Sequence, residues 1–217
     1  MREEVIQKVL ENKLIAIVRG IESEKVLKVA QALYEGGIRL MEITYNQKDP
    51  DSWQTTADAI AAVVKAFEGR MLVGAGTVTT PELVKMTARA GGCYIVSPDC
   101  NPDVIRCTRE LNMVSMPGAL TPTEVMQAHW AGADFVKLFP IGNLGVNYAK
   151  AVMAPISHVK LLAVGGINEN NVADYLKAGM VGAGIGGNLA NKKWIEEDRY
   201  DRITETARAL VVAANSI

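Results

Sequence analysis

The sequence places one lysine, Lys137, inside a short apolar run that is typical of a buried β-strand. Alternation along residues 132–140 puts Phe135, Lys137 and Phe139 on the same face of this strand. Burial between two aromatic rings disfavours the ammonium form, and a neutral amine can attack a ketone to form an imine. The alternative is an edge-strand lysine whose ammonium group reaches water.

A glutamate in an apolar strand is the second candidate for chemistry. Glu42 lies in the predicted strand 39–44, where Met41 and Ile43 flank it. An inward carboxylate in such a strand costs free energy unless it has a function or a cation partner. A general acid or base beside an imine-forming lysine has such a function, because imine formation and carbon–carbon cleavage both require proton transfers. A structural ion pair with Arg19 or Lys137 is the alternative.

Both residues belong to a regular alternation of apolar runs and amphipathic segments. Strands are predicted at 14–19, 39–44, 71–75, 93–97, 114–116, 134–138, 160–164 and 181–185. Helices are predicted at 23–34, 51–67, 81–90, 102–111, 122–130, 146–153, 169–178 and 201–214. Eight such units predict a (β/α)₈ TIM barrel as a single domain over residues 1–217, with an extra N-terminal helix at 1–12 that closes its bottom. A doubly wound sheet is the competitor, but no Gly-x-Gly-x-x-Gly follows the first strand.

The remaining candidate residues follow the predicted strands at their C-terminal ends, where barrels carry their functional side chains. Arg19 is the last residue of the first strand, and Thr77 and Pro98 follow the third and fourth strands. The seventh and eighth strands run into glycine loops, where backbone N–H groups commonly bind phosphate; the loop residues are Gly165, Gly166, Gly186, Gly187 and Asn188. Asn168 is a plausible N-cap of the next helix. Gln47 and Asp99 also fall near these ends, and we expect them to be solvated loop residues.

Composition narrows the classes of partner. The chain has 217 residues, 49% of them hydrophobic, and a formal net charge of −1. This balance gives no indication of nucleic acid or of an anionic membrane surface. The charged N-terminal segment does not resemble a signal peptide, and no apolar run reaches membrane-spanning length. Three cysteines without paired spacing and two histidines without metal-site spacing predict a cytoplasmic protein with reduced thiols and no metal.

The order and spacing of these motifs resemble those of the 2-keto-3-deoxy-6-phosphogluconate (KDPG) / 4-hydroxy-2-oxoglutarate (KHG) aldolase family. The resemblance runs from about Lys13 to Asn188. The motifs that carry it are Ile17-Val18-Arg19, Gly36-Gly37-Ile38, Glu42-Ile43-Thr44, Val73-Gly74-Ala75-Gly76-Thr77-Val78, Ile95-Val96-Ser97-Pro98, Met116-Pro117-Gly118, Thr121-Pro122-Thr123-Glu124, Val136-Lys137-Leu138-Phe139-Pro140, Gly165-Gly166-Ile167 and Gly184-Ile185-Gly186-Gly187.

The resemblance implies a class I lyase on a (β/α)₈ barrel, without metal or cofactor and commonly a homotrimer. It implies that Lys137 forms the Schiff base and that Glu42 transfers protons. Arg19 and Thr77, with the backbone near Pro98, are implied to hold the pyruvate-side carboxylate. The implied substrates are KDPG or its C4 epimer, or KHG, cleaved to pyruvate and an aldehyde such as glyceraldehyde 3-phosphate.

The chain departs from the family pattern at three positions. Asn46 stands where many members carry arginine, Ala163-Val164 replaces Pro-Thr, and Asn188 replaces serine. The first of these leaves Arg19 as the arginine for the carboxylate, and the other two remove hydroxyl groups near the substrate. The C4 configuration and the chain length of the substrate therefore stay open. A phosphosugar isomerase or epimerase and a non-catalytic phosphosugar-binding barrel are the competing functions, but neither needs Lys137.

Overall fold

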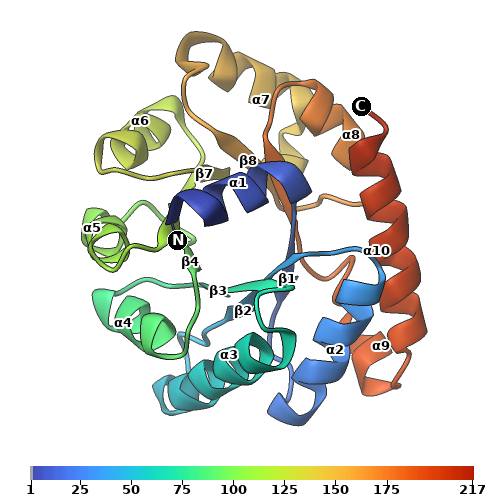
Figure 1. Ribbon diagram of the computed structural model, residues 1–217. Coiled ribbons are helices and arrows are strands. Elements are labelled where there is room, and N and C mark those ends of the chain that lie inside the picture. Colours follow the sequence, from blue (N-terminus) through green and yellow to red (C-terminus); the bar gives the residue numbers. More distant parts are fainter. Residues whose placement is uncertain (1) are drawn as a thin grey trace.

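The computed structural model describes residues 2–217, and parallel strands surrounded by helices form its centre (Figure 1). The strands are β1 (Leu14–Val18), β2 (Leu40–Thr44), β3 (Leu72–Gly76), β4 (Tyr94–Val96), β5 (Val114–Met116), β6 (Gly118–Ala119), β7 (Val136–Leu138), β8 (Leu161–Val164) and β9 (Gly182–Ile185). Their order in the sheet is β5-β4-β3-β2-β1-β9-β8-β7-β6. Each pair of hydrogen-bonded neighbours is parallel.

The two ends of this order, β5 and β6, are consecutive in the chain and separated only by Pro117. Proline has no backbone N–H, so it interrupts a strand at this position. The N–H groups of Asp134 and Phe135 donate to the Ser115 carbonyl at 3.0 and 3.2 Å, and that of Lys137 donates to the Pro117 carbonyl at 2.8 Å. These bonds close the sheet into a barrel with eight strand positions. The (β/α)₈ prediction is confirmed, and the fifth strand continues beyond its predicted end as β6.

The helices lie around this barrel (Figure 1). They are α2 (Ser23–Glu35), α3 (Trp53–Phe67), α4 (Pro81–Arg89), α5 (Pro102–Glu110), α6 (Pro122–Trp130), α7 (Gly145–Met153), α8 (Val172–Lys177), the unpredicted α9 (Lys192–Glu196) and α10 (Tyr200–Asn215). Single 3₁₀ turns occur at Pro50–Ser52, Ile141–Asn143 and Ala154–Ile156. Helices α4, α5 and α6 each begin with a proline. The residue before that proline is the N-cap, and its side chain accepts a backbone N–H of the first turn; these N-caps are Thr80, Asn101 and Thr121. These caps fix where the loops after the strands end.

Alternation along the strands separates two apolar layers. Leu40 and Phe135 belong to the cluster inside the barrel, whereas Met41 and Val136 belong to the cluster between the barrel and its helices. Lys137 and Glu42 lie two residues after Phe135 and Leu40 and therefore face the barrel interior. The strand faces predicted from the sequence are thus the observed ones.

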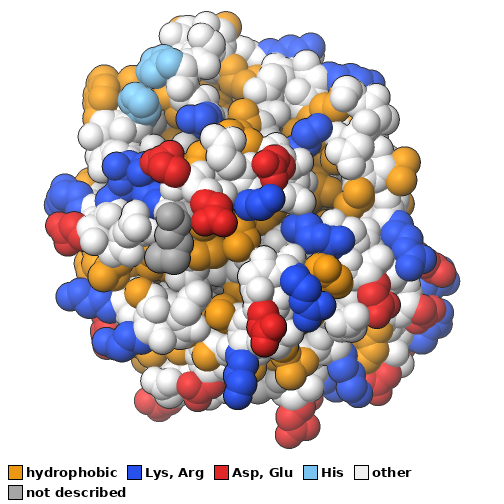
Figure 2. Space-filling view, in the orientation of Figure 1, with side chains coloured by type: hydrophobic (Ala, Val, Ile, Leu, Met, Phe, Trp, Pro, Cys, Tyr) orange, Lys and Arg blue, Asp and Glu red, His pale blue; other side chains and the backbone are white. Residues whose placement is uncertain are grey.

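The N-terminal helix α1 (Arg2–Asn12) lies across one end of the barrel (Figure 1). Its residues Val5, Ile6 and Val9 pack into the interior cluster with Leu40, which begins β2. This end is therefore the N-terminal end of the strands, and the predicted closing helix is confirmed. On the face that carries α1, acidic and basic side chains are interspersed rather than separated by sign (Figure 2).

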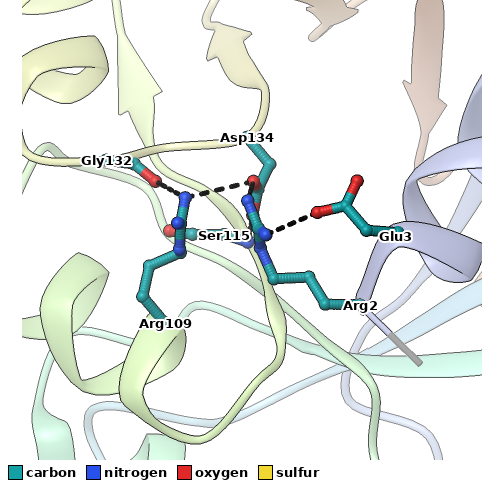
Figure 3. Close-up of polar contacts among 6 residues, drawn as sticks. All are labelled: Arg2, Glu3, Arg109, Ser115, Gly132 and Asp134. Carbon is teal, nitrogen blue, oxygen red and sulfur yellow. Dashed lines mark hydrogen bonds and ion pairs between the residues drawn. The ribbon is translucent and has the colours of Figure 1, made fainter.

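A buried carboxylate attaches α1 to the barrel. The Asp134 side chain, which is 3% exposed, accepts the Ser115 N–H at 2.9 Å and pairs with Arg2 of α1. Arg109 approaches the same carboxylate at 3.4 Å, and Figure 3 shows both arginines reaching it. Two arginine cations and one backbone N–H donor thus compensate a carboxylate that would otherwise be costly to bury.

The helix predicted at 169–178 is shorter than expected, and Asn168 is not its N-cap. Residues 168–171 form a turn. In it the Asn171 side chain accepts the Asn168 N–H and the Asn168 side chain accepts the Asn170 N–H, both at 2.9 Å. Such local side-chain bonds compete with helix formation, so α8 begins only at Val172. Within residues 2–217, no helix combines the length and apolar character needed to cross a membrane.

Candidate active site

Lys137 and Glu42 both have side chains buried in the interior of the barrel. Lys137, on β7, is 7% exposed, and Glu42, on β2, is 2% exposed. Both line a small inner cavity of about 10 Å³ whose other walls are apolar except for Gly184. This volume is near the threshold for one water molecule. The structure thus brings together the two residues that the sequence predicted to act as a pair.

Burial displaces the pKa values of both groups toward their neutral forms. It lowers the pKa of Lys137, an effect that the Glu42 charge opposes and the Arg19 charge reinforces. It raises the pKa of Glu42, against the opposing charges of Lys137 and Arg19. Within residues 2–217, Glu42 forms no ion pair shorter than 4.0 Å, so the structural ion pair considered as an alternative is not formed. The arrangement favours a neutral amine beside a protonatable carboxyl group.

An open cavity of about 500 Å³ lies at the C-terminal ends of the strands. Lys137 reaches its floor, and the Lys137 Nζ lies 4.7 Å from the centroid of the Phe139 ring, which forms part of the wall. The other predicted binding residues all line it, namely Arg19, Thr77, Pro98, Gly165, Gly166, Gly186, Gly187 and Asn188. Val164 lines both this cavity and the inner one. A groove of about 570 Å³ between α2 and α10 contains none of these residues.

Close backbone approaches shape the wall near Glu42 and Pro98. A Cβ atom added at Gly76 would lie 2.4 Å from the Glu42 Oε1, and one added at Gly118 would lie 2.5 Å from the Pro98 carbonyl oxygen. The Gly118 N–H also donates to the Asp99 carbonyl at 3.1 Å. Glycine at these two positions therefore allows Glu42 and the Pro98 loop to lie where they do. The sequence reasoning missed both roles, although both glycines lie in the motifs it singled out.

The glycine loops after β8 and β9 offer backbone donors. Gly165 and Gly166 have φ values of +94° and +75°, a region that other residues rarely adopt. Over the described residues 2–217, no protein acceptor lies in hydrogen-bonding geometry to the backbone N–H groups of Gly166, Gly187 and Asn188. Unpaired backbone N–H groups in glycine loops are the usual ligands of phosphate in this fold.

Two asparagines hold these loops in place. The Asn188 Nδ2 donates to the Ile167 carbonyl at 3.0 Å and so joins the loop after β9 to the loop after β8. The Asn171 Nδ2 donates to the Gly166 carbonyl, also at 3.0 Å. One amide hydrogen bond of Asn188 is thus used within the protein. No pattern in the sequence indicates the role of Asn171, because its partner is a backbone atom.

Comparisons with known proteins show which family this chain resembles. The model of the family "Aldolase: KDPG and KHG aldolase" matches residues 5–206. A probable 2-dehydro-3-deoxy-6-phosphogalactonate aldolase of Rhizobium meliloti is 40% identical over 83% of this chain and 82% of its own length. A 2-dehydro-3-deoxy-6-phosphogalactonate aldolase of Escherichia coli is 38% identical over 81% of this chain and 83% of its own.

A solved structure resembles the whole barrel. The KDPG aldolase of Legionella pneumophila, crystallised with pyruvate captured as a covalent carbinolamine intermediate, superposes with a TM-score of 0.84 and 25% identity over 97% of this chain and 98% of its own. With the family model covering residues 5–206, the chain belongs to the KDPG and KHG aldolase family, and it is an aldolase and therefore a lyase.

Proposed function

We propose that this aldolase acts through an imine on Lys137 and cleaves a 2-keto-3-deoxy-6-phospho sugar acid to pyruvate and glyceraldehyde 3-phosphate. The observation that carries the proposal is the position of Lys137, buried at the floor of the open cavity with a lowered pKa and with Glu42 in the cavity below. A neutral lysine amine is the nucleophile that class I aldol cleavage requires.

The reaction begins when the neutral amine of Lys137 attacks the C2 ketone of the substrate. The resulting carbinolamine loses water, for which Glu42 supplies the proton, and an iminium ion remains. Removal of the proton from the C4 hydroxyl then breaks the C3–C4 bond, and its electron pair moves into the iminium ion to give an enamine. The aldehyde leaves, C3 takes up a proton, and water hydrolyses the imine to release pyruvate and the free amine.

Glu42 is suited to these proton transfers because its raised pKa places protonation closer to neutral pH than for an exposed glutamate. The inner cavity that it shares with Lys137 has about the volume of one water molecule. A water in that cavity provides a path between the carboxyl group and the substrate.

Different residues of the open cavity bind the two charged ends of the substrate, its carboxylate and its phosphate. Arg19 and Thr77, which line this cavity with Lys137, bind the carboxylate, for which an arginine fork supplies two donors. The backbone near Pro98 borders the same region. The N–H groups of Gly166, Gly187 and Asn188, in the glycine loops that line the same cavity, bind the phosphate.

We propose that the favoured substrate has the C4 configuration of 2-keto-3-deoxy-6-phosphogalactonate. The two relatives at 40% and 38% identity are both named for that epimer. Val164, which replaces the threonine usual in the family, presents an apolar side chain to the cavity beside Lys137. A site without a hydroxyl at this point cannot stabilise the C4 oxygen of the gluconate epimer through it.

We propose further that residues 1–217 fold as one domain and work as a cytoplasmic homotrimer. The family resemblance supports the homotrimer, and three cysteines that form no disulfide are typical of a reducing compartment. Sedimentation of the purified protein tests the oligomeric state.

The first experiment is reduction with borohydride in the presence of pyruvate, followed by peptide mass mapping. A pyruvate-derived adduct on Lys137, absent from Lys137→Met, is the expected result. Kinetics with both C4 epimers then identify the preferred substrate. A folded protein that forms no adduct contradicts the imine mechanism and favours an isomerase, an epimerase or a binding protein.

A further inference from the structure

Gln47, in the loop after β2, is a residue near the cavity to which neither the sequence nor the proposed mechanism gives a role. It is exposed, as expected for a loop position, but both ends of its amide are engaged. Its Nε2 donates to the Thr77 carbonyl at 2.7 Å, and its Oε1 accepts the Thr79 hydroxyl at 2.9 Å. One side chain thus spans the loop after β2 and the loop after β3.

The backbone of Thr77 needs such support. Its φ is +57°, in the left-handed region that β-branched residues seldom occupy. Such conformations persist where the surrounding structure holds them, and they concentrate at functional sites. The Tyr45 N–H fixes the residue before it by donating to the Gly76 carbonyl at 3.0 Å. The Gln47 amide then fixes the carbonyl of Thr77 itself.

The loop that carries Gln47 is itself anchored. The Trp53 Nε1 donates to the Asn46 carbonyl at 2.9 Å, and the Asn46 side chain accepts the Lys48 N–H at 3.1 Å. Gln47 therefore extends from a backbone that is fixed on both sides. A donor fixed in this way can hold Thr77 rather than follow its movements.

Thr77 and Arg19 line the open cavity and also a second cavity of about 520 Å³, which Gln47 lines as well. They are the two residues that both cavities share, so they form the wall between them. Without support from Gln47, Thr77 has room to turn toward the second cavity and away from Lys137.

We infer that Gln47 is a positioning residue that holds Thr77 where Thr77 and Arg19 together bind the carboxylate of a 2-oxo acid. The inference rests on the proposed function, because it takes Thr77 as part of the carboxylate site. It predicts that loss of the Gln47 amide weakens the binding of carboxylate-bearing ketones and leaves the reactivity of Lys137 unchanged.

The test compares two ketones on Gln47→Leu, which retains the bulk of the side chain and lacks the amide. The pyruvate concentration that half-saturates borohydride trapping on Lys137, and the KM for cleavage, are expected to rise about 5- to 20-fold, while kcat changes less than about 2-fold. Trapping of acetone, which has no carboxylate, is expected to stay as in the wild type. Damage to the whole site reduces the trapping of both ketones.

A matched variant and a rescue complete the design. Gln54→Leu removes an exposed glutamine amide that donates to Asp58 at 2.8 Å, away from the open cavity, and is expected to behave as the wild type. Thr79→Val is expected to weaken pyruvate binding, as Gln47→Leu does. Thr79→Ser keeps the hydroxyl group and is expected to bind pyruvate as the wild type does.

The outcomes separate this inference from the function on which it rests. Equal half-saturation by pyruvate in the wild type and Gln47→Leu overturns the role of Gln47 and leaves the imine mechanism intact. Equal losses with pyruvate and acetone also overturn it, because a carboxylate-specific effect is then absent. A wild-type protein that forms no adduct overturns the proposed function and this inference with it.

Discussion

The contact between Gly76 and Glu42 makes the substitution Gly76→Ala a direct test of the catalytic geometry. The added Cβ would lie 2.4 Å from the Glu42 Oε1, 2.8 Å from the Thr44 Cγ2 and 2.9 Å from the Glu42 Cδ. Ordinary contact begins at 3.4 Å, so the carboxyl group must move by 3.4 − 2.4, or about 1 Å. The φ of Gly76 is not in the left-handed region, so alanine is not strained by the backbone itself.

A shift of about 1 Å in a reacting group typically lowers the rate about 100-fold, which corresponds to about 2.7 kcal/mol. We therefore expect the kcat of Gly76→Ala to fall about 10- to 100-fold, with little change in KM, because Glu42 moves protons rather than holding the substrate. Overpacking is expected to cost about 1–3 kcal/mol of stability, which leaves the protein folded. The assay is steady-state cleavage of the phosphogalactonate substrate, with pyruvate trapping on Lys137 as a check that the imine still forms.

A double-mutant cycle with Glu42→Ala tests whether the effect acts through Glu42. Removing the Glu42 side chain relieves the 2.4 Å contact and leaves a 2.8 Å contact between the new methyl group and the Thr44 Cγ2. The kcat of the double variant is therefore expected to match that of Glu42→Ala within about 2-fold, while its stability falls below that of Glu42→Ala. Gly74→Ala, whose Cβ would lie 2.3 Å from the Tyr94 ring, is the control for overpacking on the same strand, with lower stability but no loss specific to proton transfer. An unchanged kcat in Gly76→Ala, or a further large loss in the double variant, refutes the reasoning.

Three further predictions follow from other parts of the site and fold. Arg19→Gln removes a positive charge that lowers the pKa of Lys137, so the ammonium form of Lys137 should persist to higher pH. Trapping of acetone on Lys137 with cyanoborohydride should therefore reach half its maximum at a higher pH than in the wild type. A shift to lower pH contradicts this assignment. Val164→Thr adds a hydrogen-bonding group worth about 0.5–1.5 kcal/mol, so the ratio of kcat/KM for the two C4 epimers should move about 2- to 10-fold toward the gluconate form. An unchanged ratio means that Val164 does not determine which epimer is preferred. Asp134→Ala should lower the free energy of unfolding in urea by about 2–3 kcal/mol. This loss is smaller than for a fully buried ion pair, because the side chains of its two arginine partners are 18% and 39% exposed. Arg109→Ala should lower the free energy of unfolding by less than about 1 kcal/mol, and equal losses in the two variants contradict this ranking.

The local pattern of the sequence was sufficient to predict the barrel and the placement of its central pair. Period-two alternation put Lys137 and Glu42 on the inner faces of their strands, because neighbouring strand residues point to opposite sides of a sheet. Parallel strands in a barrel end on the same side, so Arg19, Thr77 and the glycine loops were predicted to line one cavity, and they do. These predictions depend on periodicity and chain order, which a single sequence contains.

Other features depend on contacts between segments that are distant in the chain, and the tertiary structure alone decided them. The end of the fifth strand, for example, depends on bonds between Ser115 and the segment before β7. The spacing between Gly76 and Glu42 and the bond from Gln47 to Thr77 join neighbouring strands or loops. Residue type and spacing predict which face a side chain occupies, but hydrogen-bond partners and sub-ångström clearances are set only when the closed barrel brings separate segments together.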